Sequence, residues 1–270
     1  MTILQAIILG IVQGLTEFLP VSSSGHLVLT PYVLNWQIPQ ETAFVFNVLV
    51  QVGTLVGVIV YFWADLWAIF KVMLTSFWKP AEYSRKEFRL GLYLILATIP
   101  AAVVGMLFKS QVKAAFSNPS FTLWTLLFTA LLLIVSELVG KRTRQLDSIN
   151  WWDALLIGLF QIMALFPGVS RSGATITGGM FRNFDRPTAA RFSFLMSVPV
   201  MLGAGLLSTL DLLKVPNLGD FIGPMAVGFI TAGVVGYLSI RWLLRYLTSH
   251  PLYYFSIYLI ILDILVRLLK

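Results

Sequence analysis

Residues 10–25 read G-I-V-Q-G-L-T-E-F-L-P-V-S-S-S-G, and residues 158–173 read G-L-F-Q-I-M-A-L-F-P-G-V-S-R-S-G. At an offset of 148 positions, Gly10, Gln13, Phe18, Val21, Ser22, Ser24 and Gly25 match Gly158, Gln161, Phe166, Val169, Ser170, Ser172 and Gly173. Further along, A-A-V-V-G-M-L at 101–107 resembles A-G-V-V-G-Y-L at 232–238, at an offset of 131. The chain therefore contains an internal repeat, with repeat 1 at about 1–140 and repeat 2 at about 149–270. The smaller second offset predicts a longer loop in repeat 1, between 66 and 90.

The composition predicts a membrane protein. The chain is 58% hydrophobic and 11% charged, whereas a soluble domain carries about 25% charged residues. Apolar runs close to the ~20 residues of a membrane-crossing helix occur at 43–63, 90–108, 120–139, 192–210, 221–240 and 252–269. There are no cysteines, which excludes disulfides and thiolate metal sites. We expect an all-α integral membrane protein with a single membrane domain over 1–270.

Each repeat begins with two short apolar arms around a Pro/Ser/Gly break. The arms lie at 3–18 and 25–34 in repeat 1, and at 152–166 and 173–182 in repeat 2. They are short for a full crossing and suit a re-entrant helical hairpin, whose broken backbone must be buried in protein or line a wet cavity. Three full spans follow in each repeat, and because three is odd the second repeat is inverted. The sequence thus predicts six full spans, two re-entrant hairpins and a binding site at the repeat interface.

The net charge of +7 invites a nucleic-acid interpretation, but its cations lie in short loops between the apolar runs. With the side of the N-terminus called A, side B holds thirteen Lys and Arg residues, and side A holds five: Lys109, Lys113, Lys214, Arg267 and Lys270. Cytoplasmic loops carry the excess of Lys and Arg, so side B is predicted to be cytoplasmic and both termini outside. The first hairpin then enters from outside, the second from inside, and their tips meet near the midplane. No nucleic-acid partner is predicted.

Few ionisable groups lie within the apolar segments. Glu17, His26 and Arg171 stand out, and all three lie in the broken hairpins; such groups in a membrane are functional candidates by default. A structural interpretation is a Glu–Arg pair that closes the tips, with His26 capping a backbone carbonyl. In the repeat alignment Glu17 corresponds to Leu165, Ser23 to Arg171 and His26 to Ala174. A symmetric frame with asymmetric reactive groups favours an enzyme over a transporter.

The spacing of the polar residues favours an anion site. Gln13 and Glu17 are four residues apart and share a helical face. Ser22 or Ser24 suits a helix N-cap, and the second hairpin offers Ser170, Ser172, Gly173 and Thr175 around Arg171. Helix N-termini and a guanidinium fork both suit a phosphate. The sequence contains no Walker lysine motif, so nucleotide binding is not predicted. Gln51, within an apolar run, is predicted either to reach the site or to make a helix–helix hydrogen bond.

The stretches Q-G-L-T-E-F-L-P-V-S-S-S-G-H at 13–26 and P-G-V-S-R-S-G-A-T at 167–175 resemble the undecaprenyl-diphosphatase family, also called the bacitracin-resistance protein family, and the resemblance covers essentially the whole chain. It implies an enzyme of the bacterial plasma (inner) membrane with an outward-facing site. The enzyme removes the terminal phosphate of undecaprenyl diphosphate, regenerates the lipid carrier for cell-wall synthesis and confers bacitracin resistance. The resemblance also implies a divalent cation, magnesium or calcium. The family motif begins with Glu or Gln; here Gln13 stands there, so Glu17 is the possible metal ligand.

We therefore expect Ser23, His26, Glu17 and Arg171 to be catalytic. The expected substrate-binding residues are Gln13, Ser22, Ser24, Ser170, Ser172, Gly173, Thr175 and Gln51. Ser23 is the expected nucleophile, because Ser22 and Ser24 have serine counterparts and so belong to the scaffold. His26 or Glu17 would remove its proton; alternatively, water attacks directly and Ser23 only binds phosphate.

The sequence also fits a different function and leaves the use of several residues open. A polyprenyl-phosphate flippase or ion-coupled transporter would use Glu17 or His26 as a proton site and Arg171 as a head-group anchor. The glycines at 223, 228, 233 and 236 would pack helices within a monomer or between two copies in a homodimer. Two pairs of spacing i, i+4, Glu137 with Lys141 and Asp263 with Arg267, are predicted interfacial ion pairs.

Overall fold

The computed structural model describes residues 1–108, 110–111, 119–212 and 222–269. These residues form helices and their connections, with one isolated bridge between Arg144 and Phe184. In chain order the helices are α1 (Ile3–Phe18), α2 (Ser23–Val33), α3 (Gln40–Tyr61), α4 (Trp63–Ser76), η1 (Pro80–Ser84), α5 (Lys86–Leu107), α7 (Pro119–Val139), η2 (Leu146–Ser148), α8 (Trp151–Met163), α9 (Arg171–Phe181), α10 (Arg186–Leu212), α11 (Ile222–Tyr246) and α12 (Tyr253–Leu269).

Six long helices fall on the six predicted apolar runs: α3, α5, α7, α10, α11 and α12. Four of them contain segments long and apolar enough to cross a membrane: Thr42–Tyr61, Lys86–Leu107, Ser120–Val139 and Ile222–Tyr246. Large apolar side chains such as Trp124 and Ile230 are exposed on the outer faces of these helices. Soluble proteins rarely expose large contiguous apolar surfaces. The prediction of an all-helical membrane protein is confirmed at this level.

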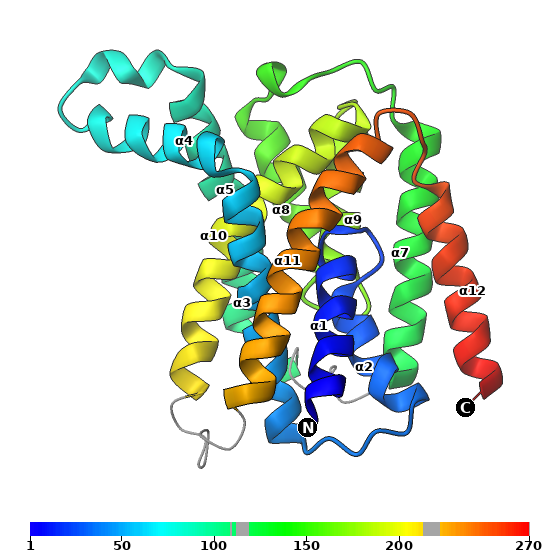
Figure 1. Cartoon of the computed structure of the whole chain (residues 1–270). Helices are drawn as coiled ribbons and strands as arrows, with labels where there is room; N and C mark the ends of the chain where they lie inside the picture. The colour runs from blue at the N-terminus through cyan, green and yellow to red at the C-terminus, as the bar shows by residue number, and fades with distance from the viewer. Residues whose placement is uncertain (109, 112–118, 213–221, 270) are drawn as a thin grey trace.

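The two broken segments form helical hairpins whose tips touch. In Figure 1 the α1–α2 hairpin starts from the end of the molecule where α1 begins and α12 ends, and the α8–α9 hairpin starts from the opposite end. At the junction, the Ser172 hydroxyl donates to the Leu19 carbonyl over 3.0 Å, and the Gly168 amide donates to Ser24 Oγ over 3.5 Å. The expected meeting of the tips is thus observed, although α8 ends at Met163, three residues earlier than expected.

Each hairpin packs against a helix of the other repeat. α1 lies along α11, and its counterpart α8 lies along α5. The contacts are close: a Cβ atom added to Gly10 would lie 2.8 Å from the Gly228 carbonyl oxygen, and one added to Gly158 would lie 2.5 Å from the Ala97 carbonyl oxygen. Ala97 and Gly228 correspond at the offset of 131, so the same contact occurs twice. The two repeats are therefore interleaved.

The glycines of α11 are used for packing within the chain. Gly228 lies against Phe46 of α3, and Gly233 lies against the backbone of Gly53, also on α3. Small residues allow helix backbones to approach closely. These two glycines therefore pack helices within one chain and not between two copies.

The longer connection predicted between 66 and 90 contains a helix, α4, together with η1. In Figure 1 α4 runs across one end of the molecule, at a steep angle to the long helices. Trp63, Trp67 and Phe70 form an exposed stacked row along it, whereas Ile69 and Val72 are buried. An amphipathic helix of this kind suits a membrane interface. The sequence did not reveal it because its apolar residues continue the run of α3.

Two buried carboxylates tie the connections together at the α4 end. Glu137 does not pair with Lys141 as predicted; it binds Arg186 at 2.6 Å and Arg142 at 3.1 Å. Asp153, at the start of α8, binds Arg144 at 2.7 Å and Arg182 at 2.5 Å. These arginines belong to the cation-rich side B.

The other predicted pair is confirmed, because Arg267 binds Asp263 at 2.8 Å. The other four cations assigned to side A, Lys109, Lys113, Lys214 and Lys270, lie outside the described residues.

Candidate active site

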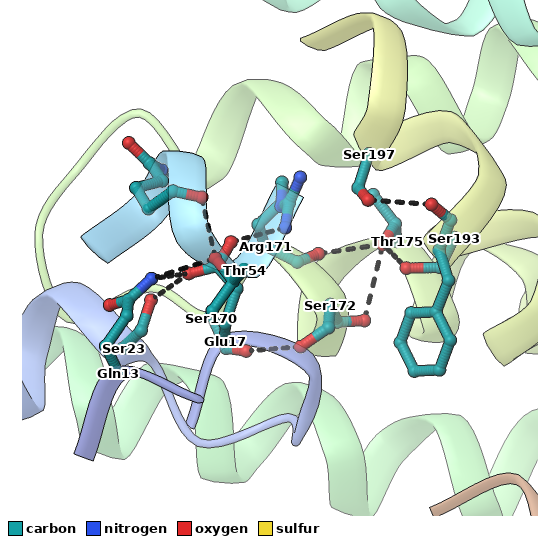
Figure 2. A network of polar contacts seen from close by, with 12 residues as sticks. Gln13, Glu17, Ser23, Thr54, Ser170, Arg171, Ser172, Thr175, Ser193 and Ser197 are labelled. Carbon is teal, nitrogen blue, oxygen red and sulfur yellow. Dashed lines mark hydrogen bonds and ion pairs between the residues drawn. The ribbon is translucent and has the colours of Figure 1, made fainter. Parts of the chain in front are cut away.

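Glu17 is the centre of a buried polar cluster at the junction of the two hairpin tips (Figure 2). Its side chain is 4% exposed. Arg171 Nη2 lies 2.5 Å from Glu17 Oε1, and the Ser23 hydroxyl donates to Oε2 over 2.5 Å. Gln13 Nε2 donates to the same Oε2 over 2.9 Å. The structure thus brings together four predicted site residues from three helices, α1, α2 and α9.

The serines on either side of Ser23 and Arg171 hold the two helix N-termini in equivalent ways. Ser22 Oγ accepts from the Gly25 amide at 3.2 Å, and Ser170 Oγ accepts from the Gly173 amide at 3.0 Å. Both are N-caps, which satisfy amides that the helix leaves unpaired. Ser23 and Arg171 are therefore the first residues of α2 and α9, where the helix dipole favours an anion.

The two remaining tip serines complete this scaffold. Ser24 Oγ lies 3.3 Å from Ser22 Oγ, and Ser172 Oγ lies 3.1 Å from Ser170 Oγ. Ser24 and Ser172 are also the serines that contact the opposite tip. Their hydroxyls are already used inside the protein, so their contribution to binding an anion comes through the backbone that they hold.

Thr54 on α3 is a member of the cluster that the sequence did not reveal. Gln13 Nε2 lies 3.4 Å from Thr54 Oγ1, which donates to the Gln51 carbonyl over 2.8 Å. Thr54 is fully buried, whereas the Gln51 side chain is exposed. Gln51 therefore joins the network through its main chain, and the structure does not bring its amide to the tip. A threonine next to Gly53 in an apolar run was the available signal.

His26 lies outside the Glu17 cluster in this structure. Its Nδ1 is 2.8 Å from the Ser22 carbonyl oxygen, and its Nε2 is 2.7 Å from the Tyr258 hydroxyl of α12. The two rings stack with centroids 5.7 Å apart. Since a carbonyl can only accept, Nδ1 carries a proton, and Nε2 of the neutral ring accepts from Tyr258. The structural interpretation, in which His26 caps a carbonyl, matches this contact.

Thr175 is directed away from the tips. Its hydroxyl is 2.6 Å from Ser193 Oγ on α10 and donates to the Arg171 carbonyl over 2.8 Å (Figure 2). This hydroxyl ties α9 to α10 one turn behind Arg171. The expected contact of Thr175 with substrate is therefore not supported by its position, although it holds the helix that carries Arg171.

The cluster offers hydrogen-bond donors to an incoming anion but a poor ligand set for a cation. Nη1 of Arg171 is buried and has no hydrogen-bond partner among the described residues. Both oxygens of Glu17 accept side-chain hydrogen bonds, and no group of three His, Cys, Asp or Glu lies close enough to hold a metal ion in the part of the chain described. A divalent cation at this position would depend on oxygens brought by the substrate.

Comparison with known proteins identifies the family. The family model of bacitracin resistance protein BacA matches residues 6–265. The chain belongs to this BacA family. An undecaprenyl-diphosphatase from Moorella thermoacetica is 45% identical over 267 residues, which cover 98% of this chain and 97% of the relative. The undecaprenyl-diphosphatase of Chlorobium phaeovibrioides is 42% identical, over 100% of this chain and 97% of the relative. That of Chloroherpeton thalassium is 41% identical, over 98% of this chain and 95% of the relative.

The BacA family match covers every residue of the Glu17 cluster and also the separate contact between His26 and Tyr258. Both hairpins lie inside it, so the family assignment applies to the junction as a whole and not to one motif.

Proposed function

We propose that this chain is an undecaprenyl-diphosphate phosphatase whose active site is the junction of the two hairpin tips. The observation that carries this assignment to the junction is the contact of one carboxylate, Glu17, with both a hydroxyl, Ser23, and a guanidinium, Arg171. A base, a nucleophile and an anion binder are the groups that phosphoryl transfer needs. The names of the relatives supply the substrate class.

Substrate binding begins with the diphosphate at the tips and the long isoprenoid in the bilayer. Nη1 of Arg171 is the buried donor that remains for a phosphate oxygen. The N-termini of α2 and α9 add backbone N–H groups and the positive ends of two helix dipoles. An anion bound here also offsets the cost of the unpaired Arg171 donor.

The chemical step follows from the short contact between Ser23 and Glu17. Glu17 takes the hydroxyl proton while Ser23 Oγ forms a bond to the terminal phosphorus, and the bridging P–O bond breaks to release undecaprenyl phosphate. Glu17 passes this proton to the departing undecaprenyl phosphate and, as a carboxylate again, takes a proton from water, whose oxygen attacks the phosphoserine. The bond between Ser23 Oγ and phosphorus breaks, Ser23 Oγ takes the proton back from Glu17, and inorganic phosphate is released. The 2.5 Å contact favours Glu17 over His26 as the base. In the alternative in which water attacks directly, Glu17 activates that water and Ser23 binds phosphate.

The geometry favours transition-state stabilisation by Arg171. Its guanidinium already holds Glu17 with one nitrogen and presents the other, so it requires little reorganisation when negative charge develops on the diphosphate oxygens. The divalent cation implied by the family resemblance stays a prediction. When bound, it would neutralise charge on the diphosphate, with Glu17 as the protein ligand at hand.

The chain is further proposed to lie in the bacterial inner membrane as an inverted repeat with six full spans. The interleaved packing of the hairpins and the position of both chain ends at one end of the molecule (Figure 1) support this topology. The arginine-rich α4 end is proposed to be cytoplasmic, so the α1–α2 hairpin and the active site open outward. The equivalent packing of the repeats also keeps a lipid flippase as a second candidate, because transporters are built in this way.

The test is the release of inorganic phosphate from undecaprenyl diphosphate by the purified protein, with Arg171→Ala measured beside it. We expect release by the wild type and a loss of more than about a hundredfold in the variant. A well-folded wild type that releases no phosphate, with magnesium or calcium supplied, would instead favour the flippase.

A further inference from the structure

Gln161 on α8 is a buried amide without hydrogen-bond partners. It is 2% exposed, and neither Oε1 nor Nε2 has a partner among the described residues. Buried polar groups are almost always paired, and leaving one unpaired costs about 1–3 kcal/mol. A stabilising role within the fold therefore does not explain this side chain.

The repeat shows why this amide has no partner. Gln161 corresponds to Gln13, whose Nε2 donates to Glu17 and Thr54. At the offset of 148, Leu165 and Leu202 occupy the positions of those two partners. Both are apolar, so repeat 2 contains the amide but lacks the two groups that bind its counterpart.

The same comparison relates Gln161 to Arg171. Gln13 and Ser23 meet on one oxygen of Glu17, and Arg171 is the counterpart of Ser23. The chain length from each glutamine to the capping serine is the same, from Gln13 to Ser22 and from Gln161 to Ser170. Each serine accepts a hydrogen bond from the amide three residues further on, although Ser22 has a φ of 70° and Ser170 is extended. Nη2 of the same guanidinium binds Glu17, so the unpaired Nη1 lies beside the Glu17 cluster. The unpaired amide of Gln161 is on α8, which packs against α9, the helix that carries Arg171. The two groups are thus buried donors on neighbouring helices of one hairpin, and repeat 2 lacks the carboxylate that their counterparts share.

We propose that Gln161 and Nη1 of Arg171 form a second phosphate subsite, which holds the phosphate attached to the lipid while the terminal phosphate meets Ser23. The inference rests on the proposed function and deepens it, because it makes the site selective for a diphosphate. Two kinds of N–H donor face an anion there, and Leu165 in place of a carboxylate removes charge repulsion. Charge that develops on the leaving undecaprenyl phosphate is stabilised by these donors.

The experiment compares Gln161→Leu with the wild type in hydrolysis of undecaprenyl diphosphate. The substitution removes both polar atoms and leaves a side chain of similar size. We expect kcat/KM to fall about tenfold or more, the effect of a hydrogen bond to a charged group. Thermal stability is expected to stay the same or rise, since no internal hydrogen bond is lost.

Product inhibition locates the effect. Undecaprenyl phosphate would occupy the second subsite, so its inhibition constant is expected to rise in Gln161→Leu, whereas inhibition by inorganic phosphate at the Ser23 side is unchanged. Ser256→Ala is the matched control, because the Ser256 hydroxyl is another buried polar group without a described partner and lies on α12. It is expected to behave as the wild type.

Gln161→Glu provides a second variant with a polar side chain of the same length. Its carboxylate would repel the lipid-linked phosphate, and we expect a larger loss of kcat/KM than in the leucine variant. If folded Gln161→Leu and Gln161→Glu both keep kcat/KM and product inhibition within about twofold of the wild type, the amide binds water only and the subsite is refuted. That result is distinct from a failure of the proposed function, in which the wild type itself releases no phosphate.

Discussion

The hydroxyl of Tyr258 lies 2.7 Å from Nε2 of His26, and the two side chains come from positions 232 residues apart. Tyr258 is partly exposed on α12, whereas His26 is buried at the start of α2. The contact fixes the ring of His26 between a backbone carbonyl and a phenol. It directs Nε2 toward α12 and away from the Ser23–Glu17 pair.

Tyr258→Phe tests whether this contact positions His26 for the reaction. The variant keeps the ring and its stacking but removes the hydroxyl, so we expect kcat/KM to fall about three- to tenfold, the effect of one neutral hydrogen bond. His26→Ala removes the hydrogen bonds to both Tyr258 and the Ser22 carbonyl, so its kcat/KM is expected to fall at least as far as that of Tyr258→Phe. The measurement is a double-mutant cycle on phosphate release, in which the double variant should be no worse than His26→Ala alone. Additive losses would show that Tyr258 acts independently of His26.

Glu17→Gln tests the assignment of the base. The amide keeps a hydrogen-bonding side chain at the junction but cannot take the Ser23 proton, so kcat should fall about 10²- to 10⁴-fold. The readout is single-turnover phosphate release, compared with binding of the substrate to the same protein. A variant that binds normally and turns over at the wild-type rate would assign the proton transfer to another group.

Ser23→Ala separates the covalent route from direct attack by water. We expect turnover to be lost, because the short contact with Glu17 prepares this hydroxyl for attack. Ser239→Ala is a suitable control, since that hydroxyl bonds only the main chain of its own helix among the described residues. Ser23→Ala protein that keeps most of its turnover would show that water attacks directly.

Arg171→Lys tests the guanidinium geometry. A lysine keeps the charge but cannot hold Glu17 with one nitrogen and a phosphate with another in one rigid plane. We expect the variant to recover only part of the activity lost in Arg171→Ala, as measured by initial rates of phosphate release. Full recovery would mean that positive charge alone is sufficient at this position.

Asp153 is expected to control stability at the α4 end without touching the active site. Burial alone would raise the pKa of the Asp153 carboxyl, but hydrogen bonds from Arg144 and Arg182 outweigh it and hold that pKa below its ordinary value of 3.8. The stabilisation is therefore complete above about pH 4 and is lost as the pH falls through the lowered pKa of the folded state.

Asp153→Asn should accordingly lower the free energy of unfolding at neutral pH by roughly 2–3 kcal/mol. This is less than for a fully buried pair because Arg182 is partly exposed. Thermal unfolding in detergent at neutral and acidic pH checks both points, since the difference between the variant and the wild type should shrink in acid. An equal difference at both values would contradict the assigned titration.

The local parts of the site follow from the sequence, and the long-range parts do not. The hairpins, the i, i+4 pair of Gln13 and Glu17, and the capping serines depend on short spacings and matched repeats, which the sequence displays directly. Thr54 and Tyr258 join the site through packing of distant helices, and an isolated polar residue in an apolar run does not indicate which way it points. The direction of Thr175, away from the tips and toward α10, has the same cause, because its hydroxyl contacts Ser193 of α10.

The interleaved packing has a consequence for biosynthesis. Residues 3–18 are translated before the other described helices, but α1 lies along α11, which is translated more than 200 residues later. Until α11 is made, the first hairpin has no permanent neighbour on that face. Glu17 also lacks its partner Arg171 until α9 has been translated, 154 residues further along the chain. We therefore expect a truncated product that ends before α11 to remain unassembled and to be a target for membrane proteases, so that hydrolytic activity is acquired only after α11 has been translated.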